Sequence, residues 1–160
     1  PTRNLTARFH AARDLRLAEE PVPVPADGES LVRVTAVGLC GSDLHWYEDG
    51  GIGDARITRP IVGGHEVAGV VEGGPLDGVH VAVDPAIPCG NCEFCLQGNP
   101  NLCSSMTFAG HGEQDGALQE WLAWNTKCLF PIPDSFTSAD GAMLEPLVEA
   151  ATALQGRGPA

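Results

Sequence analysis

Apolar residues along this chain recur in short runs of β-forming residues, separated by glycine and proline. In LVRVTAVGL the apolar positions Leu31, Val32, Val34 and Val37 lie among valine and threonine, which favour strands. Other strand-like runs are LTARFHAARDLRLAEE, which reads as two strands, then EVAGVV, VHVAV and two runs within GALQEWLAWNTKCLFPIP. This pattern predicts many short strands joined by Gly/Pro turns.

Only the last part of the chain has a clear helical pattern. In TSADGAMLEPLVEAATALQ, Thr137 or Ser138 is suited to cap a first turn, and Pro146 is suited to begin a second helix. Many short strands with one or two terminal helices predict a small, mostly β barrel or sandwich.

The composition narrows the function classes. The formal charge is −12, from 21 acidic and 9 basic residues, so the surface should repel nucleic-acid phosphates. No apolar run approaches the ~18 residues of a membrane helix. The first residues, PTRNLTARFHAARDL, have no apolar core of the signal-peptide kind. These features predict a cytoplasmic protein with no membrane or nucleic-acid partner.

Four of the six cysteines lie in PCGNCEFCLQGNPNLC, at the spacing C-x2-C-x2-C-x7-C. Tetrahedral zinc needs four thiolates at one point, and tight C-x2-C turns provide that convergence. Paired disulfides are the alternative, but they need an oxidising compartment that nothing in the chain indicates. Cys89, Cys92, Cys95 and Cys103 therefore predict a structural zinc site with no open position.

The two other cysteines differ from each other. Cys128 has apolar neighbours and is predicted to be a core thiol. Cys40 ends a strand, and His65 and Glu66 begin another strand further along the chain. Cysteine, histidine and carboxylate are the mixed ligands of a catalytic zinc with one free position. Their separation is no metal signature by itself, and His65 alone also suits a hydrogen-bonded structural role.

Five segments occur in a characteristic order: GLCGSDLHWY, GGHEVAGVV, PCGNCEFCLQGNPNLC, DGALQEW and LEPL. Together they resemble the catalytic domain of the zinc-dependent medium-chain alcohol dehydrogenases, most closely the sorbitol, L-idonate and threonine dehydrogenase branch. The resemblance covers about residues 5–154. It implies a GroES-like, partly open barrel in 1–154 with a zinc-stapled lobe at 88–104. Residues 155–160 would then be the truncated entry to a cofactor domain.

The resemblance also implies roles for individual residues. The implied ligands of the catalytic zinc are Cys40, His65, Glu66 and Glu145. Glu66 would ligate or lie just behind the metal, and Glu145 would contact the metal or its water. Ser42 would touch the substrate oxygen and start a proton relay through His45, while Asp43 would hydrogen-bond His65. The simpler alternatives are turn stabilisation by Ser42 and Asp43, an exposed His45, and a Glu145 that only complements a helix dipole.

The implied reaction is oxidation of a secondary alcohol by hydride transfer to NAD or NADP, with two zinc ions per chain. The substrate would be a small alcohol, polyol or sugar acid. Full-length members are dimers or tetramers, whereas this fragment is expected to be monomeric.

The cofactor domain of the family begins with G-x-G-x-x-G after a strand. The nearest run here, GGIGDAR, lacks the third glycine, so no cofactor-binding residue is assigned and the Rossmann domain is absent from this chain. The isolated chain is therefore expected to be inactive. The alternative is a zinc-stabilised GroES-like binding or interaction module without catalysis.

Overall fold

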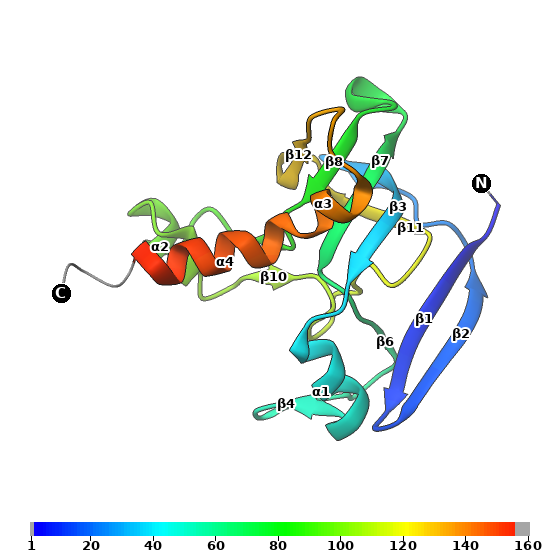
Figure 1. The fold of residues 1–160 in the computed structure, drawn as a ribbon. Helices are drawn as coiled ribbons and strands as arrows, with labels where there is room; N and C mark the ends of the chain where they lie inside the picture. Colours follow the sequence, from blue (N-terminus) through cyan, green and yellow to red (C-terminus); the bar gives the residue numbers. More distant parts are fainter. Residues whose placement is uncertain (1, 156–160) are drawn as a thin grey trace.

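The computed structural model describes residues 2–155, so most of the predicted entry to a cofactor domain, at 155–160, lies outside the described residues. The body of the molecule is a five-stranded antiparallel sheet with the order β11-β3-β7-β8-β12 (Figure 1). Its strands are β3 (Glu29–Gly38), β7 (Glu66–Glu72), β8 (His80–Val83), β11 (Trp121–Asn125) and β12 (Leu129–Pro131). The predicted mostly β architecture is confirmed.

Shorter strands make three smaller sheets beside this body. The order β2-β1-β6 joins β1 (Asn4–Ala11), β2 (Asp14–Glu20) and β6 (Ile61–Val62). Two further pairs are β4 (Gly51–Ile52) with β5 (Ala55–Arg56), and β9 (Ala86–Ile87) with β10 (Thr107–Phe108). Within 2–155 these sheets remain separate and do not close into one barrel, as expected of a partly open barrel.

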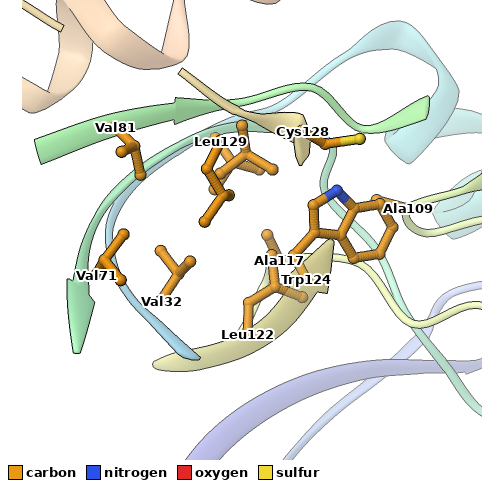
Figure 2. Packing of buried hydrophobic residues seen from close by; sticks show 11 residues of the cluster. Val32, Val71, Val81, Ala109, Ala117, Leu122, Trp124, Cys128 and Leu129 are labelled. Atoms are coloured by element: carbon orange, nitrogen blue, oxygen red, sulfur yellow. The ribbon is translucent and has the colours of Figure 1, made fainter. Parts of the chain in front are cut away.

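The main core lies on one side of the five-stranded sheet. Figure 2 shows its side chains meeting from β3, β7, β8, β11 and β12. Val32 is fully buried, and Trp124 is 1% exposed and donates its indole N–H to the carbonyl of Asp84 at 2.8 Å. That bond satisfies the polar atom which an indole brings into a core. Cys128 is buried in the same cluster, as predicted for a core thiol.

The helices are α1 (Gly41–Asp49), α2 (Glu93–Leu96), α3 (Ser138–Ala142) and α4 (Leu144–Gln155), with single 3-10 turns at Gly74–Leu76, Pro100–Leu102 and Thr126–Cys128. Thr137 caps α3, because its hydroxyl accepts from the backbone N–H of Asp140. In return, the carboxylate of Asp140 accepts from the backbone N–H of Thr137. Pro146 is the third residue of α4. Among residues 2–155, none of these helices is long and apolar enough to cross a membrane.

Helix α1 was not predicted from the sequence, where its glycines suggested a turn. It is closed at its end by Gly50, whose φ of 67° is the left-handed conformation that favours glycine. Trp46 is 4% exposed and packs with Phe9 and Ile61 in a second small core. This packing holds α1 against the β1 sheet, so tertiary contacts outweigh the weak helical pattern of the segment.

A charged network ties the β1–β2 hairpin to the loop before β11. The guanidinium of Arg8 donates to both carboxylate oxygens of Glu20, at 2.6 and 2.7 Å, and reaches Asp115 at 2.8 Å. The hydrogen bonds to Glu20 raise the pKa of Arg8, and those from Arg8 hold the pKa of Glu20 below its usual value of 4.5. Asp115 also accepts from the backbone N–H of Val62, so the network joins three segments.

Replacing Arg8 with Met should lower the free energy of unfolding by about 1–3 kcal/mol, because two partly buried carboxylates lose the guanidinium that neutralises them. The matched control is Arg16→Met, which removes an exposed pair with Asp14 and should change the free energy of unfolding far less than Arg8→Met does. Urea denaturation of the zinc-loaded chain measures both values.

The same pair makes a prediction about pH. Because folding lowers the pKa of Glu20, its contribution is fully present above about pH 4.5 and is lost as the pH falls through the lowered value. The stability difference between wild type and Arg8→Met should therefore shrink in that acidic range. Equal denaturation midpoints for Arg8→Met and Arg16→Met would contradict the role given to this network.

Candidate metal centres

The four clustered cysteines converge on one point. Ligand atoms of Cys89, Cys92, Cys95 and Cys103 all lie within 4.8 Å of one another. The sulfur of Cys95 is 3.5 Å from that of Cys92 and 4.0 Å from that of Cys89. A tetrahedron with metal–sulfur bonds of ~2.3 Å has edges of about 3.8 Å, so this arrangement suits zinc.

Local structure positions these sulfurs. Cys92 caps α2, Cys95 lies within that helix, and Cys103 directly follows the 3-10 turn Pro100–Leu102. Gly90 and Gly98 adopt left-handed φ values of 74° and 81°, which turn the chain around the sulfurs. The predicted convergence is therefore reached within one short loop.

The electrostatics of this loop also call for a cation. All six cysteines are free. The backbone N–H of Cys95 lowers the pKa of Cys92 to about 6, and that of Cys89 lowers the pKa of Cys103. Desolvation, followed by the neighbouring Cys92, raises the pKa of Cys95 to about 12. Crowded thiols cannot all ionise without a positive charge between them, and a divalent metal supplies that charge.

A second group consists of Cys40, His65 and Glu66, whose ligand atoms also lie within 4.8 Å of one another. Cys40 lies between the end of β3 and the start of α1, and Glu66 is the first residue of β7. Strands β3 and β7 are antiparallel, with Gly38 opposite Glu66. Sheet register therefore closes the gap in sequence that made this group uncertain from the sequence alone.

Glu66 has the surroundings of a metal ligand. It is only 9% exposed, and its carboxylate lies within 4.8 Å of the ligand atoms of Cys40 and His65. A buried carboxylate without a partner is costly, and a cation removes that cost. The residues present thus fit a zinc ion with two charged ligands and one imidazole.

Gly38 makes room for this carboxylate. A Cβ built at Gly38 would lie 1.9 Å from Oε2 of Glu66 and 3.0 Å from its Cβ and Cδ. The side chain of Glu66 therefore crosses the backbone of β3 where no side chain stands. Sequence analysis did not identify Gly38, although a glycine two residues before the cysteine at a strand end is a visible signal.

Asp43 links the two segments that carry the ligands. It is 3% exposed, and its two oxygens accept from the backbone N–H groups of Cys40, at 3.0 Å, and Gly64, at 2.9 Å. The implied hydrogen bond to the ring of His65 is not formed within the described residues. Both carboxylate oxygens accept from backbone donors instead.

The implied proton-relay residues lie on α1. The hydroxyl oxygen of Ser42 is buried and has no hydrogen-bond partner within 2–155. Such an orphaned donor and acceptor suits a ligand hydroxyl. The side chain of His45 is 62% exposed, and its Nδ1 lies 3.0 Å from Oδ2 of Asp49. Ser42 thus faces inward, while His45 reaches solvent.

Phe108 and Glu145 border the second group. The ring of Phe108 packs on that of His65, with centroids 5.4 Å apart. Glu145, in the first turn of α4, lies outside the three-residue group, and its contact with the metal or its water stays a prediction. Burial, with the nearby charges of Glu149 and Glu66, raises the pKa of Glu145 to about 7.

Replacing Gly38 with Ala should displace the carboxylate of Glu66 and weaken metal binding at the second group by about 10- to 100-fold, while the four-cysteine group keeps its metal. The control is Gly41→Ala, where a Cβ meets nothing within 4 Å. Metal content after dialysis against a graded chelator measures the effect. Equal retention of both metals by Gly38→Ala and wild type would contradict it.

Comparison with known proteins places this geometry in a family. The model of the alcohol dehydrogenase GroES-like domain matches residues 26–134. Sorbitol dehydrogenase of Macaca fascicularis is 40% identical over 151 residues, which are 91% of this chain and 42% of that protein. The chain thus spans less than half the length of the curated relatives that it matches.

Solved structures agree with this assignment. L-idonate 5-dehydrogenase from Escherichia coli superposes with a TM-score of 0.91 at 31% identity, over 98% of this chain and 47% of that one. A zinc-binding dehydrogenase from Sinorhizobium meliloti, solved with NADP, gives a TM-score of 0.86 at 29% identity, over 99% and 46% of the two chains. The chain therefore belongs to the alcohol dehydrogenase GroES-like domain family, the family of the zinc-dependent medium-chain alcohol dehydrogenases.

Proposed function

We propose that residues 1–154 form the substrate-side catalytic domain of a zinc-dependent polyol dehydrogenase, and that the lobe at 88–104 holds a structural zinc. The observation that carries this proposal is the second group, Cys40, His65 and Glu66, which offers three ligands of mixed chemistry. A sulfur-only site is closed, whereas a site with three protein ligands leaves a position for substrate.

The chemistry divides between the metal and the side chains around it. Zinc bound by Cys40, His65 and Glu66 supplies Lewis-acid polarisation of the substrate oxygen. The hydroxyl of Ser42 would accept the proton of the substrate alcohol while it passes its own proton on toward His45. His45 lies three residues further along α1, on the neighbouring position of the helix surface, and releases that proton to solvent.

Other residues hold this arrangement in place. Asp43 fixes the distance between the Cys40 and Gly64 backbones, and therefore between the segments that carry the ligands. Phe108 packs on one face of the His65 ring and limits its rotation. Glu145, partly buried in the first turn of α4 and close enough to Glu66 to feel its charge, would contact the metal or its water.

The hydride acceptor in this proposal is NAD or NADP, bound by a cofactor domain that these 160 residues do not contain. The support is NADP in the similar structure from Sinorhizobium meliloti and the absence of the G-x-G-x-x-G fingerprint from this sequence. The proposed substrates are polyols or sugar acids, because the similar proteins are named for sorbitol and L-idonate. A cytoplasmic location and a monomeric state of this chain belong to the same proposal.

Counting metals tests the proposal directly. The zinc-loaded chain should contain two zinc ions. Cys40→Ala should keep one of them with little change in melting temperature, because the four-cysteine group remains. Cys95→Ala should lose the other ion and melt at a markedly lower temperature, because structural zinc contributes folding energy.

Plasma emission spectroscopy and thermal denaturation give these two readings. A single zinc in the wild-type chain would favour a zinc-stabilised interaction module over an enzyme. Equal melting shifts for the two variants would contradict the division between a structural and a catalytic site.

Turnover needs the cofactor domain. Joining the chain within α4 to the cofactor domain of Escherichia coli L-idonate 5-dehydrogenase should give alcohol oxidation that the isolated chain lacks. Ser42→Ala in the chimera should lower kcat by about 10²- to 10⁴-fold, the usual range for a lost proton-transfer group. Reduced-nicotinamide absorbance follows the reaction, and Thr35→Ala, which removes a hydroxyl that bonds the Ala68 carbonyl and belongs to neither metal group, is the control. An active Ser42→Ala chimera would refute the relay.

A further inference from the structure

A cavity of about 460 Å³ lies between the second half of α1 and the β4–β5 hairpin. Its volume falls in the range of small-molecule sites. The lining residues are His45, Asp49, Gly51, Ile52, Gly53 and Arg56. None of these six residues is a candidate metal ligand, so the cavity is a part of the molecule that neither metal group uses.

Arg56 is held in a fixed position on the wall of this cavity. Its Nη1 donates to the carbonyl oxygens of Gly53, at 2.5 Å, and Ala55, at 2.9 Å. A Cβ built at Gly51 would lie 2.7 Å from Nη1 and 2.8 Å from Cδ of Arg56. The arginine therefore lies across the bare backbone of Gly51, and its guanidinium is preorganised by the hairpin.

The charge of Arg56 is not neutralised by the protein. Within 2–155 it forms no ion pair, whereas Arg59, three residues later, pairs with Glu113 at 3.0 Å and Asp115 at 3.7 Å. The one carboxylate lining the cavity, that of Asp49, is bonded to Nδ1 of His45. The remaining N–H donors of Arg56 are thus available to an anion, for which the guanidinium fork is suited.

The cavity is within reach of the second metal group. Helix α1 starts directly after Cys40, and His45 lies five positions further along the chain. At 1.5 Å per helical residue, the cavity begins about 8 Å from Cys40 along the helix axis. Helix α1 therefore connects the metal group at its start with the wall of the cavity in its second half.

We propose that this cavity is a subsite for a carboxylate or phosphate group on the substrate, and that Arg56 is the residue that selects such anionic substrates over neutral polyols. The inference rests on the proposed function and narrows its substrate class. In a chain of net charge −12, an exposed arginine that forms no ion pair within 2–155 and bonds two carbonyls of its own hairpin provides the local attraction that an anionic substrate needs.

Sorbitol and two anionic compounds with the same six-carbon chain test this subsite, and inorganic phosphate and NADP serve as further probes. The zinc-loaded chain is titrated with sorbitol, gluconate, sorbitol 6-phosphate, inorganic phosphate and NADP, and binding is followed by calorimetry and by the Nε–H signal of Arg56 in nitrogen-15 NMR. We expect gluconate and sorbitol 6-phosphate to bind at least about 10-fold more tightly than sorbitol, because each adds a charge-assisted bond. Added salt should reduce this preference.

Two variants assign the effect. Arg56→Met should abolish the preference and leave sorbitol binding unchanged, while Arg59→Met, which removes the same charge from an ion pair, should preserve the preference. Equal binding of sorbitol and gluconate, or a preference that survives Arg56→Met, would overturn the proposal. Arg56-dependent binding of NADP alone would overturn it as well, because the anion would then belong to the cofactor.

The outcome is independent of the test of the proposed function. Two zinc ions per chain together with no Arg56-dependent anion binding would reject this subsite and leave the dehydrogenase proposal standing. A single zinc, at the four cysteines, with Arg56-dependent binding of inorganic phosphate would reject the dehydrogenase proposal. It would also overturn the assignment of the anion to a polyol substrate.

Discussion

The antiparallel pairing of β3 with β7 is the constraint on which the candidate active site depends. It places Gly38 opposite Glu66, so Cys40, just beyond β3, meets His65, just before β7. Asp43 reinforces the junction by accepting from the backbone of both segments. A shift of this register by one residue would turn Glu66 to the other face of the sheet and separate the three ligands.

The two metal groups differ in what holds them together. The four cysteines are close in sequence, and glycine turns with one short helix bring their sulfurs together within a single loop. The group of Cys40, His65 and Glu66 instead depends on a sheet whose core includes Val32, Val67 and Val71. The first site therefore stabilises a loop, whereas the second is available only after the sheet has formed.

Sequence reasoning predicted the strands, the terminal helices, the buried Cys128 and both sets of clustered ligands. It failed for α1, because a segment between Gly41 and Gly50 has little helical pattern and is held by the packing of Trp46 on Phe9. Asp43 was expected to hydrogen-bond the ring of His65, but within 2–155 it accepts from the backbone N–H groups of Cys40 and Gly64. Glu145, although close enough to Glu66 to feel its charge, lies outside the ligand group.

The sequence by itself determined what depends on short-range spacing: the mostly β architecture, the sulfur-only loop and the family to which the motifs belong. Only the tertiary structure decided which side chains meet across long stretches of chain. The carboxylate of Glu66 crosses β3 at Gly38, and Arg56 rests on Gly51, and both contacts exist because a glycine has no Cβ where another side chain must pass. The sequence shows where these glycines stand, but only the tertiary structure shows which side chain fills the space beside each of them.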